Sequence, residues 1–178
     1  MKKDLTQARL KDLLNYDPET GVFSYRISRK GSGRGVGDVA GCAHDHHTGG
    51  TSNAATRRLI LIGIDYKLHR AHRLAWLYVH GEWPKGSIDH IDGDPENNRI
   101  SNLRDVPSKT NSQNMRRAQP YNSTGVLGVG RDVARGCFKS EIRLPSGKRK
   151  FLGRFKTIEE AHQAYIDAKR LLHEGCTI

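Results

Sequence analysis

Apolar residues recur at helical spacing near both ends of the chain. Close to the N-terminus, leucines share one face of a short amphipathic helix, which the turn-prone residues 17–21 close: Leu5, Leu10, Leu13 and Leu14. Close to the C-terminus, residues 157–160 form a capping box that opens a helix, and Gly175 is expected to end it. The apolar stripe of that helix consists of Ala161, Ala164, Tyr165, Ala168, Leu171 and Leu172.

Alternation with a period of two predicts strands between these helices. A strand is expected over residues 22–28, and residues 58–69 predict a strand or a hairpin that turns near Asp65. A short helix is expected over residues 71–79, with two aromatic residues in the core, Trp76 and Tyr78. Three further strands are predicted over residues 125–133, 137–144 and 148–155.

These elements divide into two groups, and we place a domain boundary near residue 118. The polar segment 115–125 contains Pro, Asn, Ser and Gly, which are typical of a linker. It separates a first domain, residues 1–117, from a second domain, residues 118–178, whose three strands form a small antiparallel sheet packed on one helix. The pattern therefore predicts an α+β protein.

The charge of the chain indicates a polyanionic partner. Lys and Arg outnumber Asp and Glu by 30 to 19, which gives a net charge of +11 and a pI near 9.8. Residues 115–178 carry +7 of this charge and residues 1–114 carry +4. Such an excess binds nucleic acid by neutralising phosphates and releasing counterions. The alternative is a basic surface that only keeps the protein soluble.

The C-terminal sheet is a candidate surface for this contact. Its helix covers one face, so the other face is free to meet a DNA groove. Basic residues along the strands are the candidates: Arg131, Lys139, Arg143, Lys148, Lys150 and Arg154. For any one of them, the alternative is the solvated face of a charged hairpin.

Residues 29–57 are rich in Gly, Arg and His and poor in apolar residues, which predicts a loop lying on DNA. Three histidines there raise the alternative of a metal site: His44, His46 and His47. We interpret them as solvated loop residues, because no matching ligand cluster follows at the spacing of a structural zinc site.

Cysteine usage and hydropathy favour a reducing cytoplasm. Cys42, Cys137 and Cys176 are odd in number and far apart, so neither a disulfide framework nor a zinc ribbon is indicated. No segment approaches the roughly 20 apolar residues of a membrane span, and residues 1–14 are too polar for a signal peptide. We expect no membrane association and no small-molecule cofactor.

The segment with the clearest chemistry runs from residue 88 to residue 114. A short strand ends in Asp89 and His90, a loop rich in Gly, Pro and Asn reverses the chain, and a second short element leads to a helix capped by Ser108. This strand–loop–strand–helix unit can bring Asp89 and Asn111 together as oxygen ligands for Mg²⁺ or a similar ion. His90 then stays free to deprotonate water, so the unit suits phosphodiester hydrolysis.

The ordered set of Asp89-His90, Asn102 within Asn-Leu-Arg, and Asn111 resembles the phage and intron-encoded branch of the HNH endonucleases. The resemblance implies a ββα-metal motif over about residues 86–116. It also implies that His90 is the general base, that Asp89 and Asn111 hold Mg²⁺ or Mn²⁺, and that Asn102 fixes the loop and orients His90. Segments that strengthen the resemblance, which covers most of residues 5–114, are residues 16–21, 71–76 and 81–84.

Several neighbouring residues have alternative interpretations. Asp92 and Asp94 can be cation ligands, but their spacing favours ordinary turn residues. Asn114 lies one helical turn from the favoured ligand and can replace it. His69 and His72 can assist near the phosphate, or be packed or phosphate-contacting histidines.

The C-terminal segment resembles the Apetala-two, or ethylene-response-factor, DNA-binding domain. The resemblance rests on residues 125–129, 138–143, 152–155 and 161–165, and it implies a three-stranded sheet in the major groove of DNA. Cys137-Phe138 stands where that family has Trp, so a base preference does not carry over.

The predicted function is therefore a metal-dependent HNH endonuclease that nicks or cleaves double-stranded DNA. The resemblance suggests a homing endonuclease of a phage or mobile element, acting in the bacterial cytoplasm. A monomer should nick, and a homodimer can break both strands. The alternatives are a DNA-binding regulator that keeps a nuclease scaffold without turnover, and a non-homing phage nuclease for packaging or restriction.

Overall fold

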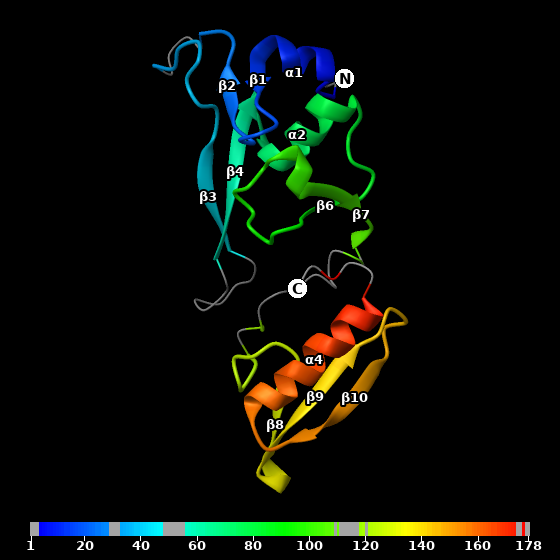
Figure 1. The fold of residues 1–178 in the computed structure, drawn as a ribbon. Coiled ribbons are helices and arrows are strands. Elements are labelled where there is room, and N and C mark those ends of the chain that lie inside the picture. The colour runs from blue at the N-terminus through cyan, green and yellow to red at the C-terminus, as the bar shows by residue number, and fades with distance from the viewer. Residues whose placement is uncertain are drawn as a thin grey trace. The chain divides into compact units, whose positions relative to one another are not determined.

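The computed structural model describes residues 4–28, 33–47, 56–108, 110, 118–119, 121–173 and 176. The chain forms two compact units, Met1–Val106 and Pro107–Ile178, which are described separately (Figure 1). Both units combine helices with antiparallel sheets, so the predicted α+β class is confirmed. Among the helices of the described residues, none has the length and hydropathy of a membrane span.

The first unit opens with a helix and a short hairpin. Helix α1, Gln7–Leu13, begins after the N-cap Thr6, whose hydroxyl accepts a hydrogen bond from the Arg9 amide. Strand β1, Leu14–Tyr16, follows directly and pairs with β2, Phe23–Tyr25. The prediction placed Leu14 on the helix and a longer strand over residues 22–28. Leu14 instead lies on β1, where it pairs with Tyr25 and is buried, and β2 ends at Tyr25.

A three-stranded antiparallel sheet follows, in the order β3-β4-β5. Its strands are β3, Cys42–His47, β4, Thr56–Ile64, and β5, Lys67–Arg70. The loop predicted over residues 29–57 is therefore wrong for residues 42–47 and 56–57. Pairing along β4 supplies the backbone hydrogen bonds of β3, and the polar composition of β3 did not reveal this partner.

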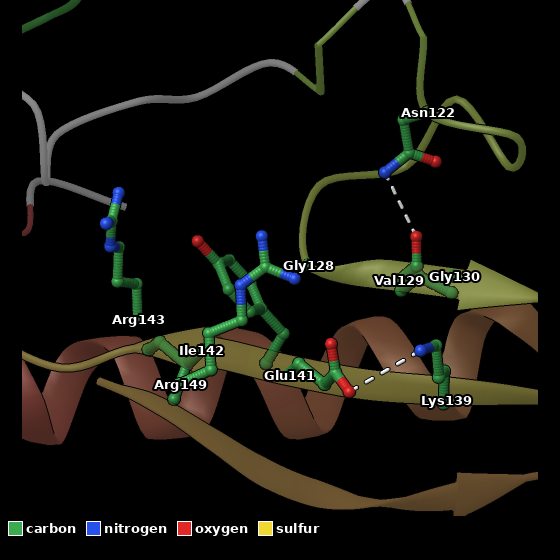
Figure 2. A pocket seen from close by; sticks show the side chains of 10 residues that line it. Asn122, Gly128, Val129, Gly130, Lys139, Glu141, Ile142, Arg143 and Arg149 are labelled. Carbon is green, nitrogen blue, oxygen red and sulfur yellow. Dashed lines mark hydrogen bonds and ion pairs between the residues drawn. The ribbon is translucent and has the colours of Figure 1, made fainter. Parts of the chain in front are cut away.

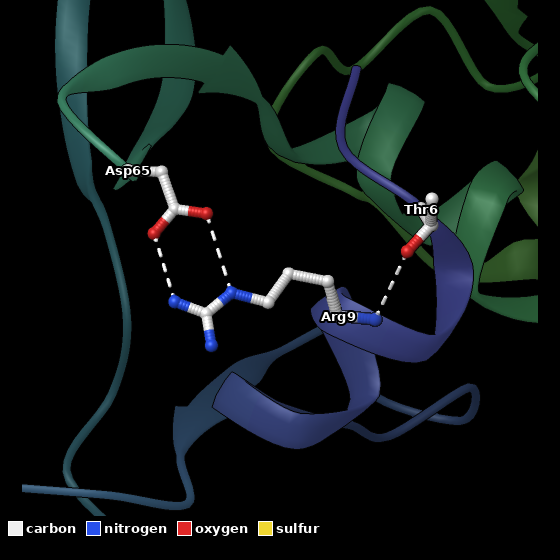
Figure 3. A network of polar contacts seen from close by, with 3 residues as sticks. All are labelled: Thr6, Arg9 and Asp65. Carbon is white, nitrogen blue, oxygen red and sulfur yellow. Dashed lines mark hydrogen bonds and ion pairs between the residues drawn. The ribbon is translucent and has the colours of Figure 1, made fainter. Parts of the chain in front are cut away.

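The predicted hairpin turn near Asp65 is confirmed, since β4 and β5 join there. Asp65 and Tyr66 adopt φ values of +45° and +62°, as a two-residue hairpin turn requires. Arg9 reaches across from α1 and donates two hydrogen bonds to the Asp65 carboxylate, at 3.0 and 3.3 Å (Figure 3).

Helix α2, Ala71–His80, provides the centre of the first core and matches the predicted helix. Leu74 and Leu77 are buried, and the left-handed Gly81 ends the helix. Trp76 and Tyr78, predicted in the core, are half-buried and pack against it. Strands β1, β2 and β4 contribute further buried side chains, and Ile88 and Leu103 of the segment that follows belong to the same core.

That segment is an antiparallel pair, β6, Ser87–His90, and β7, Leu103–Val106. The short 3₁₀ helix η1, Ile100–Asn102, leads into β7. The predicted strand, loop and second strand are confirmed. Of the helix expected after Ser108, the described residues include only Ser108 and Thr110, both helical, whereas Asn111 and Asn114 lie outside the described residues.

The second unit is a three-stranded antiparallel sheet, in the order β10-β9-β8, with one helix packed on it (Figure 1). The strands are β8, Val129–Asp132, β9, Cys137–Arg143, and β10, Arg149–Phe155, with the 3₁₀ turn η2, Val133–Arg135, between the first two. Helix α4, Ile158–Leu172, begins with the predicted capping box of Thr157 and Glu160. The predicted sheet and helix are thus confirmed.

Two details of α4 differ from the prediction. The helix ends at Leu172, whereas Gly175 lies outside the described residues. Leu171, expected in the apolar stripe, is 86% exposed, and Lys169 is fully buried. The buried face follows Ala161, Tyr165 and Lys169 at intervals of four residues, and the Lys169 ammonium lies 5.8 Å from the Tyr165 ring centroid.

Candidate active site

The antiparallel register of β6 and β7 sets Asp89 directly opposite Arg104. The Asp89 side chain is 8% exposed, and its Oδ2 accepts hydrogen bonds from Nε and Nη2 of Arg104 at 2.9 and 2.7 Å. A buried carboxylate needs a nearby positive charge, and this strand pair supplies one. Asp89 is consequently held at the site as an ordered anion.

Asn102 closes the loop between the two strands. Its Nδ2 donates to Asp92 Oδ1 and to the Asn97 carbonyl, both at 2.9 Å, while its Oδ1 accepts from the Asp92 amide at 3.0 Å. Its carbonyl also accepts from the Ile91 amide. The Asn102 side chain makes its hydrogen bonds to Asp92 and Asn97, not to the His90 ring. It therefore affects the position of His90 only through the backbone of the loop.

The residue that holds His90 is Asn98, which is buried and was not predicted. Its Oδ1 lies 3.3 Å from His90 Nε2, and its Nδ2 donates to the Glu96 carbonyl at 3.2 Å. Since the amide nitrogen must face a carbonyl, the amide oxygen faces the imidazole, and an oxygen without hydrogen only accepts. Nε2 therefore carries the proton, and Nδ1 has the lone pair that a general base needs.

His72, on α2, packs its ring edge-on against His90, with 5.2 Å between ring centroids. Burial and, to a lesser extent, the neighbouring His90 together lower the pKa of His72 to about 3. Burial also lowers the pKa of His90 below its ordinary value, against the opposing effects of Asn98 and Asp92. Both rings are therefore neutral at neutral pH, which leaves His90 able to accept a proton.

The aspartates of the loop serve as turn residues. Asp92 accepts hydrogen bonds from Asn102, from Asn97 Nδ2 at 2.6 Å and from the Asp94 amide at 2.8 Å. Asp94 in turn accepts from the Glu96 amide at 3.0 Å. Their oxygens stabilise the loop backbone, as the turn interpretation predicted.

The described residues contain one of the two expected metal ligands. Asp89 offers a hard carboxylate oxygen of the kind that Mg²⁺ and Mn²⁺ prefer, whereas Asn111 lies outside the described residues. Within the described part of the chain, no group of three His, Cys, Asp or Glu side chains is placed to hold a metal ion. The donor chemistry of Asp89 fits such an ion, and Arg104 already occupies one of its oxygens.

The structure does not bring all six predicted DNA-binding residues to one face of the C-terminal sheet. Cross-strand partners share a face, and buried Ser140 and Ile142 of β9 mark the face that α4 covers. Lys150 pairs with Ile142, and Arg131 pairs with Phe138 on that same helix-covered face. Of the other predicted residues, Lys139, Arg143 and Arg154 lie on the opposite face, and Lys148 lies in the β9–β10 turn.

We call the face turned away from α4 the outer face. Besides its three predicted residues, it carries Arg149, Phe151 and two acidic side chains, Asp132 and Glu141. Figure 2 shows Arg143, Arg149, Glu141 and Lys139 lining one hollow, with Lys139 and Glu141 paired at 3.5 Å. Arg154 is paired with Asp132 at 2.8 Å. The two pairs leave Arg143 and Arg149 as the outer-face arginines without an acidic partner among the described residues.

Sequence reasoning missed three residues of these surfaces: Asn98, Arg104 and Arg149. Asn98 was hidden in an Asn-rich loop, where any of several amides suited a turn. Arg104 and Arg149 depend on strand register, which a single sequence does not specify. The consecutive basic residues after Gly147 gave a partial indication, because neighbouring residues of a strand point to opposite faces and one of them must therefore lie on the outer face.

Comparison with known proteins identifies the segment that contains β6, the loop and β7. The family model described as HNH endonuclease matches residues 69–113. Protein 3.8 of Escherichia phage T7 is 34% identical over 90 residues, which cover 50% of this chain and 74% of that protein. The chain belongs to the HNH endonuclease family. The matched segment of this HNH protein begins at His69 and includes the Asp89-His90 pair, Asn98 and Asn102. No solved structure matches the chain.

Proposed function

We propose that this HNH family member is a metal-dependent endonuclease that hydrolyses phosphodiester bonds of double-stranded DNA. The observation that carries the proposal is the His90 arrangement: a neutral imidazole, oriented by Asn98 through Nε2, next to the ordered carboxylate of Asp89. A regulator that only binds DNA does not require a base and an anion held in this way.

His90 acts as the general base at Nδ1. The proton of an attacking water moves to Nδ1, while the Nε2–H bond to Asn98 keeps the ring in place as it becomes positive. Asp89 and Asn111 would hold Mg²⁺ or Mn²⁺, which would neutralise charge on the scissile phosphate and its leaving oxygen. Asn102 maintains the loop that joins the two strands.

The outer face of the C-terminal sheet grips DNA in this proposal. It presents four basic side chains, Lys139, Arg143, Arg149 and Arg154, on a sheet that α4 stabilises from the other side. The arrangement of three antiparallel strands and one helix agrees with an Apetala-two-like domain that enters a DNA groove. Such contacts set the register of the enzyme on its substrate.

A phage or mobile-element role, with action in the bacterial cytoplasm, is the biological setting we propose. Its support is the similarity to a phage protein. Homing and a non-homing task such as packaging or restriction share this chemistry.

The test is cleavage of supercoiled plasmid by the purified chain with Mg²⁺ or Mn²⁺, resolved into nicked and linear products. We expect metal-dependent conversion that EDTA stops. Asp89→Asn and His90→Ala are the matched variants, since each should still bind DNA but cut it far more slowly than the wild type. Cutting by the EDTA-treated chain, or full activity of His90→Ala, would contradict the mechanism.

A further inference from the structure

The ion pair between Asp89 and Arg104 differs from the others in the described residues. It is the shortest, at 2.7 Å, and its side chains are only 8% and 27% exposed. The comparable pair of Arg9 and Asp65 is 50% and 55% exposed at 3.0 Å. Solvent screens the exposed pair strongly, whereas it screens the largely buried pair of Asp89 and Arg104 much less.

The partner of Asp89 is specified by the fold. The two residues face each other across β6 and β7, and Nε and Nη2 of Arg104 converge on a single oxygen, Oδ2. A divalent ion bound by the same carboxylate places a second cation beside this guanidinium. Like charges this close repel, so one carboxylate cannot satisfy both cations at full strength.

We propose that Arg104 is the resident counter-ion of the metal site, and that a divalent metal binds Asp89 by displacing it. The inference rests on the proposed function, because it takes Asp89 to be a metal ligand. Arg104 holds the carboxylate in place while the metal is absent, and its competition lowers the affinity for the metal. Metal binding at Asp89 and release of Arg104 are then one coupled equilibrium.

The displaced guanidinium has an evident partner in the substrate. Its planar set of N–H donors matches phosphate oxygens, and its side chain already reaches solvent from a strand of the site. In the DNA complex, Arg104 therefore moves from Asp89 to a phosphate near the cleavage point. It is a positioning residue for Asp89 in the free protein and a phosphate contact in the complex.

The test measures Mn²⁺ binding to the full chain without DNA. Electron paramagnetic resonance gives the concentration of free Mn²⁺ in the titration. Arg104→Gln removes the competing charge, so we expect its Kd for Mn²⁺ to fall by about fivefold or more. Arg9→Gln is the matched control, because it breaks an Arg–Asp pair outside the site and should leave Kd unchanged. Asp89→Asn supplies the baseline for Mn²⁺ bound elsewhere.

Cleavage by Arg104→Gln should show the opposite change. At saturating Mn²⁺ its rate should be below that of the wild type, since the phosphate loses a contact. Tighter metal binding with slower cleavage distinguishes competition from a merely structural role, which would weaken both.

An unchanged or weaker Mn²⁺ affinity of Arg104→Gln overturns the inference, provided that the wild type binds Mn²⁺ and cuts DNA. A wild type that does neither overturns the proposed function and this inference with it. If Arg104→Gln does not fold, Arg104→Lys decides instead. One ammonium competes less well than two guanidinium N–H groups, so Mn²⁺ affinity should rise by a smaller factor, and an affinity no higher than that of the wild type refutes the competition.

Discussion

We predict that arginines on the outer face of the C-terminal sheet contact DNA phosphates. Substitutions that remove their charge test this prediction. The double variant Arg143→Gln/Arg149→Gln removes the two arginines of this face that have no acidic partner among the described residues. Lys139 and Arg154 remain, each already paired with a carboxylate. The change therefore removes the positive charge that is most available to phosphates while leaving the packed face of the sheet intact.

The expected magnitude follows from counterion release. Each phosphate contact contributes about 0.9 to the slope of log K against log[salt], so two lost contacts should flatten the slope by about 1.8. Raising KCl from about 50 to about 200 mM weakens DNA binding by a certain factor in each protein. For the double variant, this factor should be roughly twelve times smaller than for the wild type. Its affinity at low salt should fall most.

Fluorescence anisotropy with a labelled DNA duplex, in EDTA to prevent cleavage, measures these slopes. The matched control is Arg131→Gln/Lys150→Gln, which removes the same charge from the face that α4 covers. We expect the control slope to stay near that of the wild type. An equal flattening by both double variants would refute the argument from strand register. Two unchanged slopes would show that this sheet does not hold DNA.

Three further substitutions test the site and the second core. His90→Ala should lower single-turnover cleavage by about 10²-fold or more with little change in DNA affinity, and unaltered cleavage would exclude a general base there. Asn98→Ala should lower the same rate by a smaller factor, because it frees the imidazole without removing it; a rate equal to that of the wild type would exclude the orienting role. Gly128→Ala should destabilise the second unit by more than about 2 kcal/mol, since its Cβ would meet the Tyr165 ring at 2.0 Å and its φ is +78°. Hydrogen exchange should then speed up over residues 121–173 and not over residues 56–106, and unchanged exchange would contradict the packing.

Local signals in the sequence were enough for the elements and for the order of the chemical groups. The period of the apolar residues identified α2, the hairpin that turns at Asp65 and the C-terminal sheet, because each buries one face of a regular element. The capping box of α4 is local in the same way. The Asp89-His90 pair and Asn102 stood out because their spacing resembled that of one family.

Pairing between distant segments was decided only by the tertiary structure. The polar residues 42–47 become a strand because β4 lies beside them, and Lys169 is buried because it lies on the face of α4 that packs on the sheet. Strand register sends Arg149 to the outer face and Lys150 to the other. The same kind of register sets Arg104 opposite Asp89, and the folding of the loop brings Asn98 to His90. A sequence states which groups a chain carries, but a hydrogen bond or an ion pair also needs two backbones at a fixed separation, and only the packed fold provides that.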